Sequence, residues 1–167
     1  MEELDVINNW RFRADRVQQA HYLAGRRYER FNRYMGVPTT LIMAVVGTTI
    51  FSNLSENASG LSTELQIIVG GLSVLAAALS GIQTFLGFSE LAEKHRLAGA
   101  RYAHLKQTLE LLECLNSESK YKDLQDIEAQ WGKLREESPN LPQTVWGKIK
   151  KELTYDIHQK KYTKNKA

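Results

Sequence analysis

The sequence predicts an all-α protein: a two-pass transmembrane helical hairpin with long cytosolic helical extensions and a C-terminal cytosolic helical pair. Two observations lead to this fold class. The chain of 167 residues contains two long stretches without Lys, Arg, Asp or Glu. On both sides of them, apolar residues recur at alternating three- and four-residue steps, the period of a helix with one buried face. No segment shows the two-residue alternation of a strand.

The first element is a helix over residues 1–34, which we assign to the cytosol. Its apolar seam consists of Ile7, Trp10, Ala14, Val17, His21, Ala24, Tyr28, Phe31 and Met35. Such a seam is typical of coiled-coil packing. The N-terminus is acidic and lacks an apolar core, so we expect the first membrane span itself to serve as the anchor.

The transmembrane hairpin is expected over residues 35–89. The first charge-free stretch, Tyr34–Ser55, has 22 residues. As a helix it would be roughly 33 Å long, enough to cross a bilayer core of about 30 Å. Because Pro38 disfavours helix at the residue before it, the sequence predicts a kink or short break at Gly36-Val37-Pro38, at the start of a span over about residues 36–55. Hydroxyls scattered around this span can bond to their own helix backbone.

The second span is expected over residues 65–89, and its 25 charge-free residues correspond to roughly 37 Å of helix. A soluble bundle with two buried helices is the alternative, which we disfavour because such helices rarely lack charge all round for this length. The helix is expected to continue unbroken to about Leu115. Its cytosolic seam consists of Leu91, His95, Ala98, Tyr102, Leu105, Leu109 and Leu112.

One face of the second span is small and polar. This stripe, at strict steps of four and three, consists of Gln66, Gly70, Ser73, Ala77, Ser80, Thr84 and Gly87. The opposite face is aliphatic and suits lipid. Small residues let membrane helices approach closely, so the stripe is interpreted first as a packing seam within the hairpin or between copies. The second interpretation is that it lines an aqueous path when several copies assemble.

Residues 90–167 are expected to form a cytosolic helical region with a basic tail. Tyr121, Leu124, Ile127, Trp131 and Leu134 predict one helix, and Val145, Trp146, Ile149, Leu153 and Ile157 predict another. The turn Ser138-Pro139-Asn140-Leu141-Pro142 separates them. A linker is expected at 116–119, and a lysine-rich tail begins at Lys160.

Basic residues flank both spans on one side of the hairpin. They are Arg26, Arg27, Arg30 and Arg33 before the first span, and Lys94, Arg96 and Arg101 after the second. The connecting loop, residues 56–64, has two acids and no base. The positive-inside rule therefore predicts cytoplasmic termini. The six arginines could hold an anionic ligand such as a nucleotide, but a topology signal with contacts to anionic lipid is favoured. The net charge of +3 is too small to indicate a nucleic-acid binder.

No catalytic residue, cofactor or metal site is expected. The four histidines fall at no metal-ligand spacing, and His21 and His95 lie on apolar seams where a satisfied core histidine is the favoured interpretation. The single cysteine, Cys114, cannot form an intrachain disulfide. Nucleophile motifs are absent. Neither span carries an ionisable residue, which argues against a proton-coupled pump.

The order of these features resembles the SLATT family of two-transmembrane effector domains, associated with bacterial nucleotide-signalling and conflict systems. The matching pieces are RRYERFNRYMGVPTTLIMAVVGTTIFSNLS, the short acidic loop, and IVGGLSVLAAALSGIQTFLGFSELAEKHRLAGARYAHLKQTLELL. The resemblance covers roughly Trp10 to Leu112. It implies a pore-forming effector, an ion channel of antiviral defense, that breaches the inner membrane and stops growth or kills the cell after a nucleotide signal.

Two functions are therefore carried forward. The first is a homo-oligomeric membrane effector that forms or gates a pore in the bacterial inner membrane. Its trigger would be a cyclic nucleotide or a separate sensor protein acting on the cytosolic helices. The second is a non-conducting membrane anchor or adaptor whose cytosolic helices recruit a signalling partner. A transporter is disfavoured because one hairpin offers no internal repeat.

Overall fold

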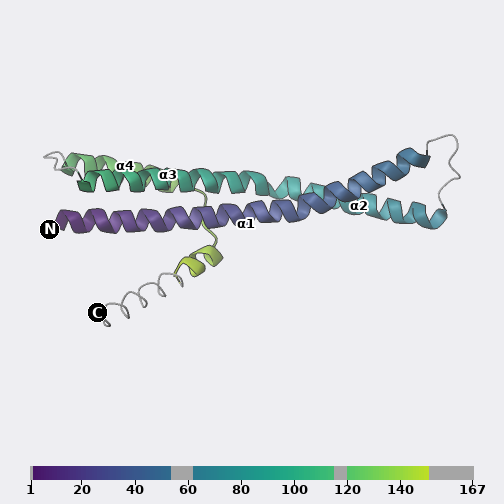
Figure 1. The fold of residues 1–167 in the computed structure, drawn as a ribbon, viewed down its shortest axis with the longest axis horizontal. Coiled ribbons are helices and arrows are strands. Elements are labelled where there is room, and N and C mark those ends of the chain that lie inside the picture. The colour runs from purple at the N-terminus through teal and green to yellow at the C-terminus, as the bar shows by residue number, and fades with distance from the viewer. Residues whose placement is uncertain (1, 54–61, 115–119, 151–167) are drawn as a thin grey trace. The chain divides into compact units, whose positions relative to one another are not determined.

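The computed structural model describes residues 2–53, 62–114 and 120–150, and all its regular structure is helical. The helices are α1 (Glu2–Asn53), α2 (Thr63–Leu86), α3 (Phe88–Cys114) and α4 (Lys120–Glu137) (Figure 1). Residues 143–150 are also helical, and no strand occurs in the described ranges. Residues 56–61 of the predicted loop (56–64), the predicted linker at 116–119, and the end of the last predicted helix with the lysine-rich tail lie outside the described residues.

The chain divides into two compact units. Unit 1 consists of Met1–Arg27 and Ala92–Ala167, and unit 2 consists of Tyr28–Leu91. The boundaries of these units lie at 27/28 and 91/92, whereas the sequence predicts the ends of the hairpin at 34/35 and 89/90. Unit 2 contains both charge-free stretches, whereas unit 1 contains all three tryptophans. Each unit can therefore be described by itself.

Helix α1 runs through the segment Gly36-Val37-Pro38, so the predicted short break there is wrong. Pro38 removes the N–H that the carbonyl of Tyr34 would otherwise accept. On the same part of the helix, the hydroxyls of Thr39 and Thr40 donate to the carbonyls four residues earlier, at 2.8 and 2.9 Å. Neighbouring helical turns thus remain closely bonded, and one missing backbone bond does not end the helix.

The predicted unbroken helix from the second span to about Leu115 is also wrong, because Gly87 interrupts it. Gly87 is left-handed, with φ 54° and ψ 38°, and its N–H donates to the carbonyl of Gln83 at 3.2 Å. Helix α3 begins at the next residue, and Leu91 N–H donates to the Gly87 carbonyl at 3.0 Å. Glycine adopts this conformation without the Cβ penalty of other residues, so it ends α2 at little cost.

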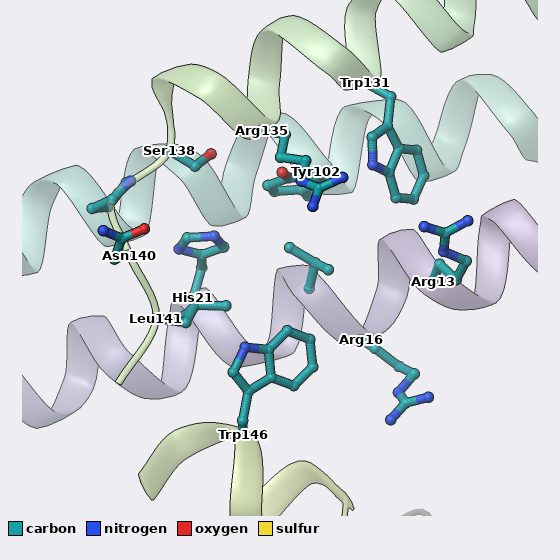
Figure 2. A pocket seen from close by; sticks show the side chains of 12 residues that line it. Arg13, Arg16, His21, Tyr102, Trp131, Arg135, Ser138, Asn140, Leu141 and Trp146 are labelled. Atoms are coloured by element: carbon teal, nitrogen blue, oxygen red, sulfur yellow. The ribbon is translucent and has the colours of Figure 1, made fainter. Parts of the chain in front are cut away.

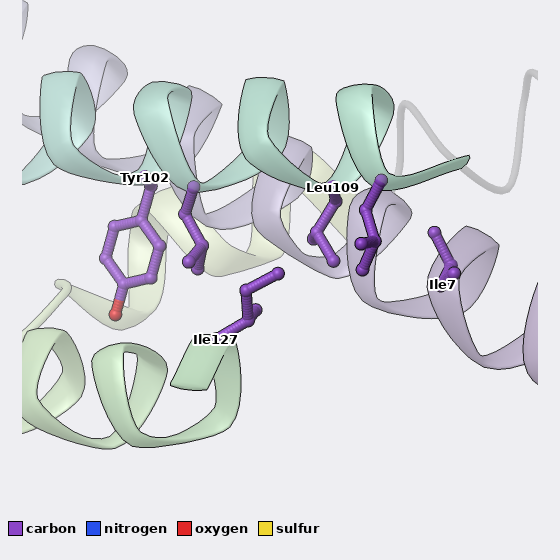
Figure 3. Close-up of a cluster of buried hydrophobic side chains, with 6 residues drawn as sticks. Ile7, Tyr102, Leu109 and Ile127 are labelled. Carbon is purple, nitrogen blue, oxygen red and sulfur yellow. The ribbon is translucent and has the colours of Figure 1, made fainter. Parts of the chain in front are cut away.

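The core of unit 1 forms where α1, α3 and α4 meet (Figure 3). The buried cluster consists of Ile7, Tyr102, Leu105, Leu109, Leu112 and Ile127, and Trp10, Val17, Leu124, Trp131 and Leu134 pack against it. These are the seam residues that the three- and four-residue steps predicted. Ion pairs at the edge also join the helices, with Arg11 2.7 Å from Glu113 and Lys106 2.8 Å from Asp15.

The interior of unit 1 also holds a histidine pair between α1 and α3. Nδ1 of His21 lies 3.0 Å from Nδ1 of His95, and the two side chains are almost fully buried. One ring donates and the other accepts, so the two imidazoles hold complementary tautomers. The ring of His21 also stacks on Tyr102, with centroids 5.6 Å apart. The bond pairs one nitrogen of each ring inside the core, in line with the interpretation of both residues as core histidines.

Candidate functional site

Unit 2 is held together by a narrow line of contact between α1 and α2. The buried residues along this line are Thr39, Val46 and Ala76. Near its end, the Gln83 amide donates to Oδ1 of Asn32 at 2.8 Å. A Cβ at Gly36 would lie 3.0 Å from that amide nitrogen, so the absence of a side chain there leaves room for it. The two helices therefore lie side by side, and this polar bond joins them.

The outer surface of unit 2 is apolar and exposed. The two helices are long and apolar enough to cross a membrane, yet only 11% and 6% of their most apolar windows is buried in the chain. Large side chains are among the most exposed, including Phe51 at 80%, Val74 at 72% and Phe85 at 89%. The core helix of a soluble bundle would bury most of such a window. The described chain therefore does not bury these stretches in the way that the soluble-bundle interpretation requires.

The small-polar stripe lies beside the contact line rather than on it. Successive residues of a helix are separated by about 100°, so Leu75 and Ala77 lie on opposite sides of the buried Ala76. Within the stripe, Gln66, Gly70, Ala77 and Thr84 are exposed, whereas Ser73, Ser80 and Gly87 are half-buried. The half-buried residues form the inner edge of the stripe, which borders α1. The exposed residues form its outer part, which the described residues of one chain do not cover.

Three glycines of α2 have no close neighbour among the described residues. A Cβ added at Gly70, Gly71 or Gly81 would meet no atom within 4 Å. The interpretation of the stripe as a packing seam within the hairpin thus fits only its inner edge. Close packing of its outer part requires a second copy or another molecule.

The hydroxyls in both apolar helices bond to their own backbone. Ser73 donates to the carbonyl of Val69 at 2.8 Å, and Thr84 donates to that of Ser80 at 2.9 Å. Thr48 does the same in α1. Each hydroxyl proton is therefore satisfied, as the sequence predicted for the first span, and each oxygen keeps lone pairs that can accept a bond from water or a neighbouring helix.

The six predicted arginines do not gather into one site within either unit. In unit 1, Arg101 pairs with Glu137 at 2.6 Å, Arg96 lies 3.7 Å from Glu93, and Arg27 donates to the hydroxyl of Thr144 at 2.5 Å. Arg26 is exposed on the surface of α1. In unit 2, Arg33 lies 3.3 Å from Glu29, and Arg30 is exposed. Four of the six thus have a partner within the chain.

Comparison with known proteins leaves the chain without an assigned relative, since no family model, no curated protein and no solved structure matches it. Within the residues that the structure describes, no three His, Cys, Asp or Glu side chains gather as they would around a metal ion.

Sequence reasoning missed the polar bond inside unit 2. Gln83 is not one of the stripe residues, and Asn32 lies before the first charge-free stretch. The available signal was the helical spacing. Asn32 and Gly36 are four residues apart, so they lie on the same face of α1. The side-chain amide of Asn32 and the space left by the glycine therefore both face Gln83 on α2.

Proposed function

We propose that this chain is a two-pass protein of the bacterial inner membrane, with both termini in the cytoplasm, that assembles as a homo-oligomer and forms or gates a pore. In keeping with its resemblance to SLATT effectors, the pore would serve antiphage defense or nucleotide-signalled growth arrest. The observation that carries the membrane part of the proposal is the exposure of the two apolar windows. Lipid that removes this apolar surface from water would contribute about 25 cal/mol per Å² covered.

The pore part of the proposal is supported by the uncovered outer part of the stripe. Lipid would favour aliphatic residues on every side of α2, but its two flanks differ: Ala77 and Thr84 lie on one, Leu75 and Ile82 on the other. Small residues suit a second helix, and hydroxyl and amide oxygens suit water. An oligomer in which copies meet at Gly70 and Gly71 would bring the exposed Gln66 and Thr84 toward a common axis.

The orientation rests on charge. The arginines before the first span and the bases after the second fall on one side of the hairpin, and short basic flanks remain in the cytoplasm. Cys114 tests this in the native chain, because it is exposed and is the single cysteine. In intact cells, a membrane-impermeant maleimide should leave Cys114 unlabelled and label a cysteine placed at Ser62. Labelling of Cys114 without permeabilisation would contradict the orientation.

A non-conducting anchor or adaptor is the second candidate. It is favoured by the hydroxyls of Ser73 and Thr84, which donate to their own helix and need no water. It is also favoured by the separate core of unit 1, which provides a folded body for a partner to bind. Under this alternative, the stripe only packs against another helix.

Leakage from liposomes separates the two candidates. The purified full chain would be reconstituted into vesicles loaded with a self-quenching dye, with Ala77→Trp and Leu75→Trp as matched variants. The two positions flank Ala76 symmetrically and are both exposed, so a tryptophan at either should fold equally well. The pore proposal predicts leakage that Ala77→Trp changes and Leu75→Trp leaves unaltered. Intact vesicles with correctly inserted protein, or equal effects at both positions, would favour the adaptor.

A further inference from the structure

Unit 1 contains a cavity that none of the sequence predictions used. It has a volume of about 460 Å³ and opens between α1, α3, the end of α4 and the helical residues 143–150 (Figure 2). The side chains that define its chemistry are Arg13, Arg16, Tyr102, Trp131, Arg135 and Trp146. Small-molecule sites commonly have volumes of about 300–1,000 Å³, so the cavity is large enough for a ligand of several rings or groups.

The charge of the lining is positive. Three arginines contribute to it, and none of the lining residues is Asp or Glu. These three guanidinium groups form no ion pair with a carboxylate of the described residues, although elsewhere in unit 1 Arg11 and Arg101 each have one. Nε of Arg16 is buried without a hydrogen-bond partner among the described residues.

The same cavity presents flat aromatic surfaces. Trp131 and Trp146 reach it from separate helical segments (Figure 2). Tyr102 meets Trp131 edge-on, with ring centroids 6.0 Å apart, and Arg13 lies 5.5 Å from the centroid of Trp131. Arg13 therefore covers a face of Trp131, and a planar group can stack only on a ring face that no guanidinium covers.

Polar groups complete the lining. The amide of Asn140 can both donate and accept, which suits the edge of a heterocycle. The hydroxyl of Ser138 donates to the Leu134 carbonyl and keeps its oxygen free to accept. The combination of planar guanidinium groups, stacking faces and an amide is a recognition set for a phosphorylated ring compound.

We propose that this cavity binds a small phosphorylated molecule with a flat aromatic ring, of the nucleotide class. The ring stacks against Trp131 or Trp146, and Arg13 and Arg135 bind the phosphate oxygens. The role of this site as the receptor for an activating signal rests on the proposed effector function. Ligand binding itself can be measured whether or not the protein conducts ions. A failure of binding and a failure of pore formation are therefore distinguishable.

The test is a calorimetric titration of the full chain in lipid nanodiscs with ATP, cyclic AMP and cyclic di-AMP. Adenosine and inorganic pyrophosphate supply the ring and the phosphates separately. At least one nucleotide should bind, and more tightly than both adenosine and pyrophosphate. Because a hydrogen bond to a charged group contributes about 1.5–3 kcal/mol, Arg13→Ala and Arg135→Ala should each weaken binding by about tenfold or more. Trp146→Ala should weaken it as well, and Trp146→Phe should retain most of it.

The matched control is Lys122→Ala, an exposed basic residue of α4 outside the cavity. It should leave the affinity unchanged, and intrinsic fluorescence of every variant would verify that unit 1 is folded. The absence of binding by all three nucleotides at millimolar concentration would overturn the proposal. Equal losses in Arg13→Ala and Lys122→Ala would overturn the site assignment. If pyrophosphate binds as tightly as the nucleotides, the cavity is an anion site that does not recognise a ring, and the proposal is overturned. The proposal is also overturned if anionic lipid in the nanodisc abolishes nucleotide binding.

Discussion

The buried histidine pair makes the stability of unit 1 depend on pH. Burial, with a contribution from the neighbouring His95, lowers the pKa of His21 from 6.5 to about 4. Burial also lowers the pKa of His95. The unfolded chain therefore binds more protons than the folded one between about pH 6.5 and pH 4. Stability is complete above pH 6.5 and is lost as the pH falls toward 4.

The size of the effect follows from the shift of His21. Lowering the pH from 7.5 to 5 should cost about 2 kcal/mol of unfolding free energy from His21, and His95 adds to the loss. All three tryptophans belong to unit 1, so the urea midpoint of intrinsic fluorescence, measured on the full chain in detergent, reports this unit. The midpoint should fall on acidification.

The control replaces both members of the pair, as His21→Phe with His95→Leu, so that neither ring remains without its partner. Apolar side chains of similar size should keep the core filled and remove most of the pH dependence. An undiminished drop between pH 7.5 and 5 in the double variant would refute the assignment to these histidines. A native midpoint that does not move would refute the burial argument itself.

Three further predictions concern packing and backbone. Leu109→Ala should destabilise unit 1 by about 2–5 kcal/mol in the same urea assay because the side chain is fully buried, whereas Leu111→Ala, 67% exposed, should change little. Gln83→Leu should weaken unit 2 by about 0.6–1.7 kcal/mol, the range for bonds between membrane helices, as measured by unfolding in mixed micelles. Gly87→Ala should cost about 1–2 kcal/mol in those micelles because alanine resists the left-handed conformation. An unchanged midpoint in any of the three destabilising variants would contradict the corresponding contact or conformation.

The seams of unit 1 could be predicted from the sequence because burial follows a helical period. Ile7, Ala14, Tyr102 and Leu109 are buried as their spacing required. The prediction failed at single residues whose effect depends on backbone geometry. Pro38 remains inside α1 although its propensity favours a break, and Gly87 ends α2 although its neighbours favour helix. Periodicity identifies which face is buried, but it does not determine where one residue turns the chain.

The placement of the stripe shows a similar limit. The spacing of Gly70, Ala77 and Thr84 identified one face of α2, but the line that α1 covers is centred on Ala76, one residue away. A single sequence does not specify how far a helix rotates against its neighbour, since small and aliphatic residues both tolerate the contact. The cavity of unit 1 could not be predicted for another reason. Its arginines and tryptophans come from three separate segments of the chain, which meet only after folding.

Cysteine accessibility tests the central claim most directly. On a Cys114→Ser background, single cysteines at Ala77 and Leu75 would be treated in activated membranes with a charged, membrane-impermeant thiosulfonate, and modification would be followed by mass shift and by ion flux. A water-lined stripe predicts that the Ala77→Cys chain is modified and its flux altered, while the Leu75→Cys chain in lipid is not. Protection of both positions, with flux unchanged, would contradict the pore.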